Sequence, residues 1–232
     1  TGKQSSVLKQ LAKELVEEHE EIKGVIEHVN PKSGNVIFSG NERVLAGKGA
    51  IHEQILGKEF LISSQAFFQV NVEQAEALYS KAIALASLTG SESVVDAYCG
   101  VGTLSLFASD HSASVLGIEY VPAAIRDAKH NADLNGIHNC TFICGKTEET
   151  LHEWGNVDVI FLNPPRKGCA PRVLQTIAEK GISRCIYISC HPESLARDCK
   201  HLVELGYSLK TVYPVDMFPQ TMHIENVVLL ER

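Results

Sequence analysis

Short apolar runs alternate with stretches of helical spacing over the second half of the chain. Pro122, Pro171 and Pro192 each open one of the helical stretches, because the fixed φ angle of proline suits the first turn of a helix. The apolar runs are too short for helices and are bounded by turn residues, which predicts β-strands. These predicted strands cover residues 93–96, 115–118, 141–143, 157–162, 184–189, 212–215 and 226–230.

Strands that are apolar along their whole length are typical of a sheet buried on both faces, which in turn indicates mostly parallel strands with helices as crossovers. The sequence therefore predicts a doubly wound α/β domain of the Rossmann-like type. In such a domain ligands bind at the carboxyl ends of the strands. We place this domain at residues 72–232, beginning with an Ala/Leu-rich helix at 72–86.

The first part of the chain has a different pattern. Apolar residues at helical spacing predict a surface helix over residues 5–22, and two β-rich runs at 24–29 and 35–38 flank a Pro/Gly turn, as in a hairpin. Short strands are expected at 44–45 and 59–62. We interpret residues 1–71 as a small α+β lobe.

The composition excludes some classes of function but does not indicate a specific one. The net charge of −7 excludes a module that binds nucleic acid by bulk charge alone, and the hydrophobic fraction of 44% is that of a globular protein. No apolar run reaches the roughly 18 residues of a membrane helix. The seven cysteines contain no CxxC pair, so we expect no metal site in this chain and reduced thiols in the cytoplasm.

The end of the first strand of the α/β domain is a candidate ligand site. A glycine pair, Gly100 and Gly102, follows Asp96, but Ser105 stands where a dinucleotide fingerprint requires a third glycine. Glu119 ends the next strand, where a carboxylate accepts hydrogen bonds from ribose hydroxyls. The alternative is a tight turn with an exposed glutamate, and Tyr98 either contacts a ligand or packs in the core.

The candidate chemistry lies at the ends of three later strands. The Asn163-Pro-Pro turn is followed by Arg166, where amino-group methyltransferases carry an aromatic residue. Cys190 ends a strand just before a helix N-terminus, which stabilises a thiolate, although a lone cysteine is more often a small buried apolar residue. Glu225 opens the last strand and is either buried near the cleft or solvated.

Together these segments resemble the RNA 5-methyluridine methyltransferases, most closely the bacterial 23S ribosomal RNA members. The resemblance implies a class I S-adenosylmethionine-dependent fold, with Cys190 as nucleophile and Glu225 as general base. It implies that Gln69, Tyr98, Glu119 and Asn163 bind the cofactor, although many members have aspartate at the last position. The other six cysteines are expected to be structural. The motifs are SQAFFQVN from Ser64, DAYCGVG from Asp96, NPPRKG from Asn163, SCHPESLARD from Ser189 and MFPQTMHIE from Met217.

The chemistry of uracil explains these residue types. Carbon 5 is a poor nucleophile until a thiolate adds to carbon 6, and a base must later remove the proton from carbon 5. Glu225 is therefore expected to be ionised rather than neutralised by burial. Arg166 either stabilises the enolate oxygen or a phosphate, or forms a structural ion pair.

The substrate base must leave its stack to reach a buried thiol. Phe67, Phe68 and Phe218 are candidate stacking surfaces, with core packing expected for at least two of them. The partner is expected to be RNA, ribosomal rather than transfer RNA, with no membrane partner and a monomer favoured. Full-length relatives carry an N-terminal RNA-binding barrel that we do not find in this sequence, so weak RNA binding is expected. The alternatives are a transfer RNA uridine, an RNA cytosine at carbon 5, and a non-catalytic binding module.

Overall fold

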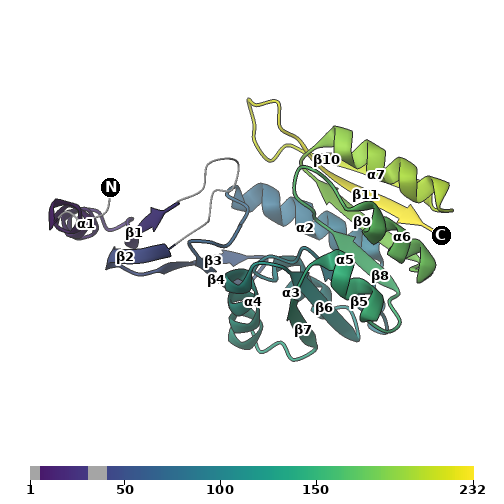
Figure 1. The fold of residues 1–232 in the computed structure, drawn as a ribbon, viewed down its shortest axis with the longest axis horizontal. Helices are drawn as coiled ribbons and strands as arrows, with labels where there is room; N and C mark the ends of the chain where they lie inside the picture. The colour runs from purple at the N-terminus through teal and green to yellow at the C-terminus, as the bar shows by residue number, and fades with distance from the viewer. Residues whose placement is uncertain (1–5, 31–40) are drawn as a thin grey trace.

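The computed structural model describes residues 6–30 and 41–232. Its centre is a seven-stranded sheet of order β10-β11-β9-β8-β5-β6-β7 (Figure 1). β7, β6, β5, β8 and β9 run parallel, and β11 is antiparallel to both β9 and β10. The prediction of a mostly parallel sheet is confirmed. The strands are β5 Ser93–Ala97, β6 Ser114–Glu119, β7 Cys140–Cys144, β8 Val159–Leu162, β9 Arg184–Ser189, β10 Ser208–Val215 and β11 Glu225–Glu231.

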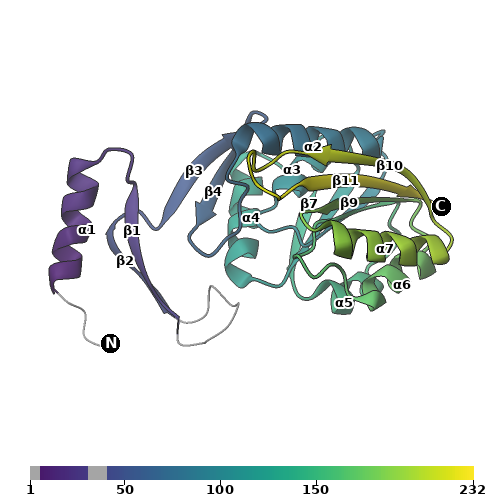
Figure 2. The ribbon, with the colours of Figure 1, turned by 90° about the horizontal axis from the view of Figure 1, so that it is seen from above.

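Helices cover both faces of this sheet, because side chains that point alternately to the two faces are buried along the whole of the central strands. Helices α2, α3 and α4 pack in one apolar cluster, and α6 and α7 pack in the other with the residues around α5 (Figure 2). Three of these helices begin with a proline, as predicted from the sequence. The helices are α2 Val72–Ala86, α3 Thr103–Ser109, α4 Pro122–Leu134, α5 Thr147–Thr150 with the 3-10 turn η1 Leu151–Glu153, α6 Pro171–Glu179 and α7 Pro192–Glu204.

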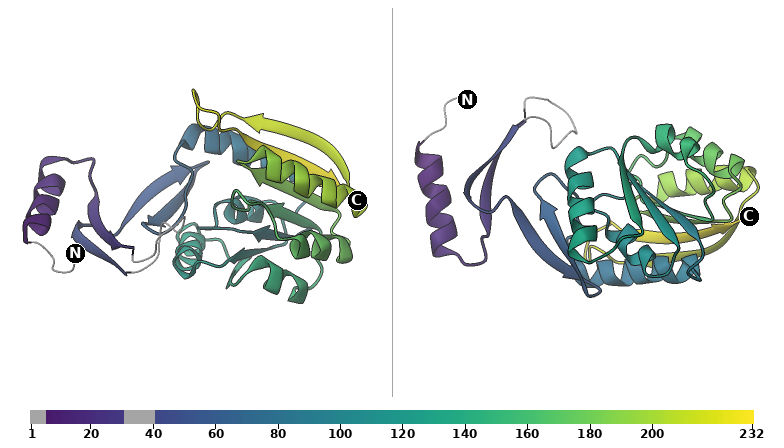
Figure 3. Two further views of the ribbon diagram at one scale, coloured as in Figure 1. Left: turned by 45° about the horizontal axis from the view of Figure 1, so that its top comes forward. Right: turned by 90° about the horizontal axis from the view of Figure 1, so that it is seen from below.

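The N-terminal elements extend away from the sheet (Figure 3). Helix α1 (Ser6–Glu18) packs on β1 (Gly24–Val29) and β2 (Asn41–Gly47), and these two strands pair antiparallel. The second strand of the predicted hairpin, 35–38, lies outside the described residues. A further hairpin of β3 (Ala50–Ile55) and β4 (Lys58–Ser63) follows. The sequence analysis missed β3, because its outward-facing His52 and Gln54 weaken the apolar signal of the strand.

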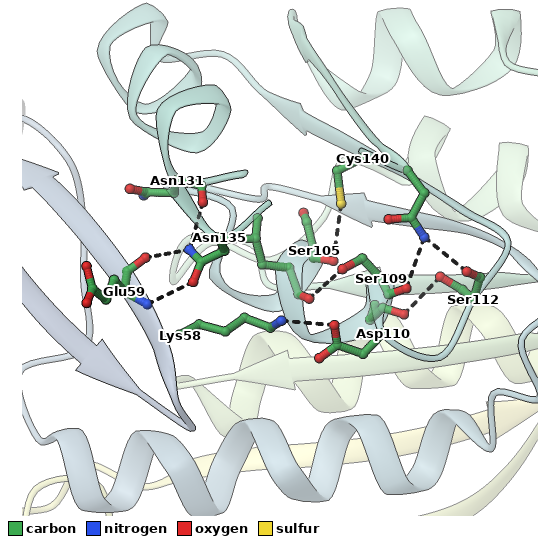
Figure 4. Close-up of polar contacts among 12 residues, drawn as sticks. Lys58, Glu59, Ser105, Ser109, Asp110, Ser112, Asn131, Asn135 and Cys140 are labelled. Atoms are coloured by element: carbon green, nitrogen blue, oxygen red, sulfur yellow. Dashed lines mark hydrogen bonds and ion pairs between the residues drawn. The ribbon is translucent and has the colours of Figure 1, made fainter. Parts of the chain in front are cut away.

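Helix α4 holds β4 through side chains rather than through a neighbouring strand. The Asn131 amide accepts from the Leu61 N–H at 2.7 Å and donates to the Leu61 carbonyl at 3.1 Å. Asn135 pairs with Glu59 in the same way, as Figure 4 shows. Asp127 accepts from both the N–H and the hydroxyl of Ser63. Residues four apart on a helix rise about 6 Å, close to the roughly 6.6 Å between alternate strand residues, so the two ladders match.

This ladder decides where the following segment lies. Ser63 is the last residue of β4, and the segment 64–71 leads directly from it to α2. Beside the ladder, Lys58 forms an ion pair with Asp110 at 2.9 Å, which joins the hairpin to the end of α3 (Figure 4). The hairpin therefore positions Phe67, Phe68 and Gln69 at the edge of the sheet.

Candidate functional site

A pocket opens at the carboxyl ends of β5 and β8. Its lining combines a carboxylate, an amide and several aromatic rings. Both Tyr98 and Asn163, two of the predicted cofactor ligands, line it. The full lining is Phe67, Phe68, Tyr79, Asp96, Tyr98, Cys99, Gly100, Val101, Thr103, Leu104 and Asn163.

The turn after β5 has an unusual backbone. Tyr98 has a φ of 69°, which side-chain-bearing residues rarely adopt, and Gly102 has a φ of 84° where it caps α3. A Cβ on Gly102 would come within 3.2 Å of atoms of Leu106, Ala128 and Phe142. Strain of this kind at a pocket edge is a mark of a functional turn.

Asp96 lies at the bottom of this turn and is only 1% exposed. Its Oδ2 accepts a hydrogen bond of 2.6 Å from the Ser105 hydroxyl. Burial raises the pKa of Asp96 to about 7, and the hydrogen bond from Ser105 opposes that rise. The serine that breaks the dinucleotide fingerprint therefore has a role of its own, as the partner of a buried carboxyl.

Glu119, at the end of β6, supports the same turn. Its Oε2 accepts from the Gly100 N–H at 3.3 Å, and its Oε1 accepts from the Val121 N–H at 2.9 Å. The carboxylate is half-buried beside the pocket residues Cys99 and Gly100. Each of its oxygens keeps a further lone pair for a hydroxyl donor.

The segment after β4 covers the pocket from the other side. Phe68 packs on Phe60 with ring centroids 5.9 Å apart, and Gln69 is buried, whereas Phe67 is 71% exposed. Phe218 is partly buried against the main cluster and contacts His223 edge-on. The expectation of core packing thus holds for Phe68 and Phe218, and Phe67 presents its ring to solvent at the pocket.

Cys190 and Glu225 meet at the same edge of the sheet. Asn226 pairs with Ser189, so the next step along this antiparallel ladder sets Glu225 beside Cys190. Arg166, in the loop after β8, lies near both residues, and its guanidinium acts to lower the pKa of the Cys190 thiol and the pKa of the Glu225 carboxyl. The structure therefore brings together three residues that are far apart in the sequence.

Burial affects the pKa of both Glu225 and Cys190. Glu225 is only 5% exposed, and burial raises its pKa to about 7 against the attraction of Arg166. Burial and the neighbouring Glu225 also raise the pKa of the Cys190 thiol, while Arg166 opposes the rise. Burial thus opposes the charged form of both residues, and the charge of Arg166 offsets part of that cost.

Tyr79 is a buried pocket residue that the sequence did not single out. It stands on α2, 6% exposed, lines the pocket, and packs on Phe107 with centroids 5.7 Å apart. Burial first, and then Asp96 and Glu225, raise the pKa of Tyr79, so its hydroxyl is a neutral donor. The only signal in the sequence was an aromatic residue in a helix otherwise rich in alanine and leucine.

The remaining cysteines agree with a structural role. All seven are free, and Cys99, Cys169, Cys185 and Cys199 are buried. Burial raises the pKa of the Cys169 thiol to about 12, with the Tyr187 and Tyr98 hydroxyls as its neighbours. Within the described residues no group of three or more histidine, cysteine or acidic side chains could hold a metal ion.

Comparison with known proteins gives this geometry a context. An RNA methyltransferase of Halalkalibacterium halodurans is 48% identical over 214 residues, which are 90% of this chain and 47% of the relative. The chain thus spans about half the length of the curated relatives it matches.

No helix of residues 6–30 and 41–232 is long and apolar enough to cross a membrane.

Solved structures show the same fold. The tRNA (uracil-54, C5)-methyltransferase of Pyrococcus abyssi, solved with S-adenosyl-L-homocysteine, has a TM-score of 0.75 and 30% identity over 90% of this chain and 50% of that one. A precorrin-6y C5,15-methyltransferase of Geobacter metallireducens shares the fold alone, with a TM-score of 0.62 and 13% identity over 75% of this chain and 94% of that one. The family model described as tRNA (Uracil-5-)-methyltransferase matches residues 9–232. The chain therefore belongs to the tRNA (uracil-5-)-methyltransferase family.

Proposed function

We propose that this protein transfers a methyl group from S-adenosylmethionine to carbon 5 of a uridine in RNA. The observation that carries this proposal is the meeting of Cys190, Glu225 and Arg166 at the sheet edge that also holds the pocket. A nucleophile, a base and a cation are the groups that this reaction needs. The tRNA (uracil-54, C5)-methyltransferase of Pyrococcus abyssi, which is similar to this chain, supports the same conclusion.

The pocket residues fit the cofactor chemically. A nucleoside that carries an amino acid and a sulfonium needs carboxylate and amide acceptors and an apolar slot for adenine, without a phosphate cradle. Asp96, Asn163 and the ring of Phe68 line the pocket, and Glu119 keeps lone pairs for ribose hydroxyls beside it. We propose that Gln69, Tyr98, Glu119 and Asn163 hold the cofactor, which supplies an electrophilic methyl group.

The chain's own residues carry out the remaining steps. The Cys190 sulfur adds to carbon 6 of uracil, and the electron pair of the carbon 5–carbon 6 bond moves toward carbon 5 and the carbonyl oxygen at position 4. Carbon 5 then takes the methyl group. Glu225 removes the proton left on carbon 5, the double bond re-forms, and the Cys190 sulfur leaves. Arg166 stabilises the negative charge on sulfur before the addition.

The pKa values suit these roles at neutral pH. A general base works best when its pKa is near the working pH, and the pKa of Glu225 is about 7. Cys190 must lose its proton to solvent before the addition, in a site where burial raises its pKa, so that Glu225 stays ionised for the later removal of the carbon 5 proton. Arg166 offsets part of the cost for both residues.

We propose ribosomal RNA as the substrate, on the sequence resemblance, with a transfer RNA uridine as the alternative. Phe67 is the ring available for stacking on an unpaired base, since Phe68 and Phe218 pack against the core. The free thiols fit a reaction in the reducing cytoplasm. A cytosine substrate and a non-catalytic module remain outcomes of the test below.

The test uses the full-length protein, S-adenosylmethionine and RNA that contains 5-fluorouridine. Fluorine at carbon 5 cannot leave as a proton, so a covalent protein–RNA adduct should accumulate and remain visible in a denaturing gel. Cys190→Ala should abolish the adduct, and the matched variant Cys199→Ala should not. Absence of the adduct with the wild-type protein contradicts the mechanism, and an adduct formed only with 5-fluorocytidine RNA identifies cytosine as the substrate.

A further inference from the structure

The loop that carries Arg166 is fastened along α7 at three successive points. The Ser194 hydroxyl donates to the Arg166 carbonyl at 2.9 Å, and Arg197 Nη2 donates to the Lys167 carbonyl at 2.8 Å. The Cys169 N–H donates to Asp198 Oδ2 at 2.8 Å. Three backbone groups within four residues are therefore held by one helix face, because residues three and four apart share a face.

Asp198 is the buried centre of this fastening and is 2% exposed. Its Oδ2 also accepts from the Tyr187 hydroxyl at 2.6 Å, and its Oδ1 accepts from Arg197 Nε at 2.9 Å and Nη2 at 2.7 Å. Gly168 packs so closely that a Cβ there would lie 2.4 Å from Asp198 Oδ2. The carboxylate thus joins the end of the loop to β9 and to α7.

The same helix follows the nucleophile in the chain. Cys190 stands two residues before α7, and His191 caps the helix by accepting the Ser194 N–H at its Nδ1. The helix therefore fixes both the strand end that carries Cys190 and the loop that carries Arg166. An exposed arginine on an unfastened loop would sample many positions, and holding it in place in advance reduces that entropic cost.

We propose that Ser194 and Asp198 are positioning residues that hold Arg166 against the Cys190 sulfur. They touch neither the pocket nor the reacting atoms, and they act through the loop backbone. The proposal rests on the proposed role of Cys190 as nucleophile. It predicts that the reactivity of Cys190 depends on α7 residues that the sequence analysis did not select.

The experiment measures alkylation of Cys190 by iodoacetamide at neutral pH in the full-length protein, followed peptide by peptide in a mass spectrometer. Ser194→Ala keeps the Ser194 N–H bond to His191 and removes only the hydroxyl. It should slow Cys190 alkylation roughly 3- to 10-fold, the effect of about one hydrogen bond. Alkylation of the exposed Cys144 is the internal standard, and Glu204→Gln, at the end of α7, is the matched control that should leave the rate unchanged.

A double-mutant cycle separates positioning from general stability. Arg166→Gln should slow alkylation by itself, and Ser194→Ala should add little in that background, because both changes remove the same contact. Asp198→Asn should behave as Ser194→Ala does, with a larger loss. An unchanged rate in Ser194→Ala, or effects that multiply in the cycle, would overturn the proposal.

The readout needs neither RNA nor cofactor, so it is independent of the adduct test. If the two substitutions are non-additive in the cycle, the positioning role of Ser194 is supported even when the wild-type protein forms no adduct. In that case only the proposed reaction fails. If the adduct forms but the rate effects of Ser194→Ala and Arg166→Gln multiply, the proposed reaction is supported and the proposed positioning role is rejected. The melting temperature of Ser194→Ala should stay within a few degrees of wild type, since a purely structural role would lower it without a selective effect on Cys190.

Discussion

The Asn131 amide pairs with both backbone groups of Leu61 and so replaces the neighbouring strand that β4 lacks on that side. Asn131 is fully buried, and its Nδ2 also donates to the Val101 carbonyl at 3.1 Å. One side chain thus joins the β3–β4 hairpin, α4 and the turn that lines the pocket. The position of Gln69 and the position of the pocket are linked through this residue.

Replacing Asn131 should therefore be costly. Asn131→Ala leaves the Leu61 N–H and two carbonyls without partners, so the free energy of unfolding should fall by roughly 2–4 kcal/mol. Urea denaturation followed by circular dichroism measures the loss. Asn135→Ala, at the exposed end of the same ladder, is the control and should cost less than half as much, because water reaches the Glu59 groups that it frees. Equal losses in the two variants would contradict this account.

Burial of Glu225 should make stability depend on pH. An unfolded glutamate has its ordinary pKa of 4.5, and the folded pKa is about 7, so the folded state binds more protons between these values. The stability that the protonated group contributes is complete below pH 4.5 and is lost as the pH rises through 7. Glu225→Gln should match wild type near pH 4.5 and exceed it by roughly 1–3 kcal/mol at pH 8.

Urea denaturation of wild type and Glu225→Gln at both pH values checks this. The contributions of all other titratable groups cancel when the free energies of unfolding of the two proteins are subtracted. Glu231→Gln, at the other and less buried end of β11, is the matched control. A Glu225→Gln protein that is less stable than wild type at pH 8 would mean that the carboxylate is stabilised rather than strained there.

The two adjacent phenylalanines should separate binding from folding. Phe67→Ala should change the free energy of unfolding by less than about 0.5 kcal/mol, because its ring is 71% exposed. It should weaken adduct formation with 5-fluorouridine RNA by about 1–3 kcal/mol of lost stacking, or roughly 5- to 150-fold. Phe68→Ala should in contrast lose roughly 2–4 kcal/mol of stability, because its ring packs on Phe60.

Gly168 should tolerate no side chain. Gly168→Ala would place a Cβ 2.4 Å from Asp198 Oδ2 and 2.5 Å from Arg197 Nη2 at a φ of 79°, so we expect a loss of roughly 2–4 kcal/mol in thermal or urea unfolding. Gly136→Ala is the control: its φ is 65°, but a Cβ there meets nothing within 4 Å, so it should cost only about 1 kcal/mol of backbone strain. A similar loss of stability in both variants would show that the Asp198 side chain can move away from the added Cβ at little cost.

Local signals account for the parts of the fold that were predicted well. Residues 72–86 and 184–189 were predicted with the observed bounds, because apolar periodicity, prolines at helix starts and glycine turns act over a few neighbouring residues. The rule that ligands bind at the carboxyl ends of parallel strands was enough to select Tyr98, Glu119 and Cys190 as candidates, whereas Asn163 was selected by the family resemblance. These features depend on the order of residues along the chain, so the amino-acid sequence carried them by itself.

Other features depend on residues that only folding brings together. The pairing of β11 with β9 sets Glu225 beside Cys190, burial there raises the pKa of both groups, and α7 fastens the loop that holds Arg166 near them. Side chains of α4 likewise replace a strand partner for β4. The register between distant strands and the exclusion of water are properties of the packed chain, so the tertiary structure alone decided which groups of the site are buried together and which contacts support them.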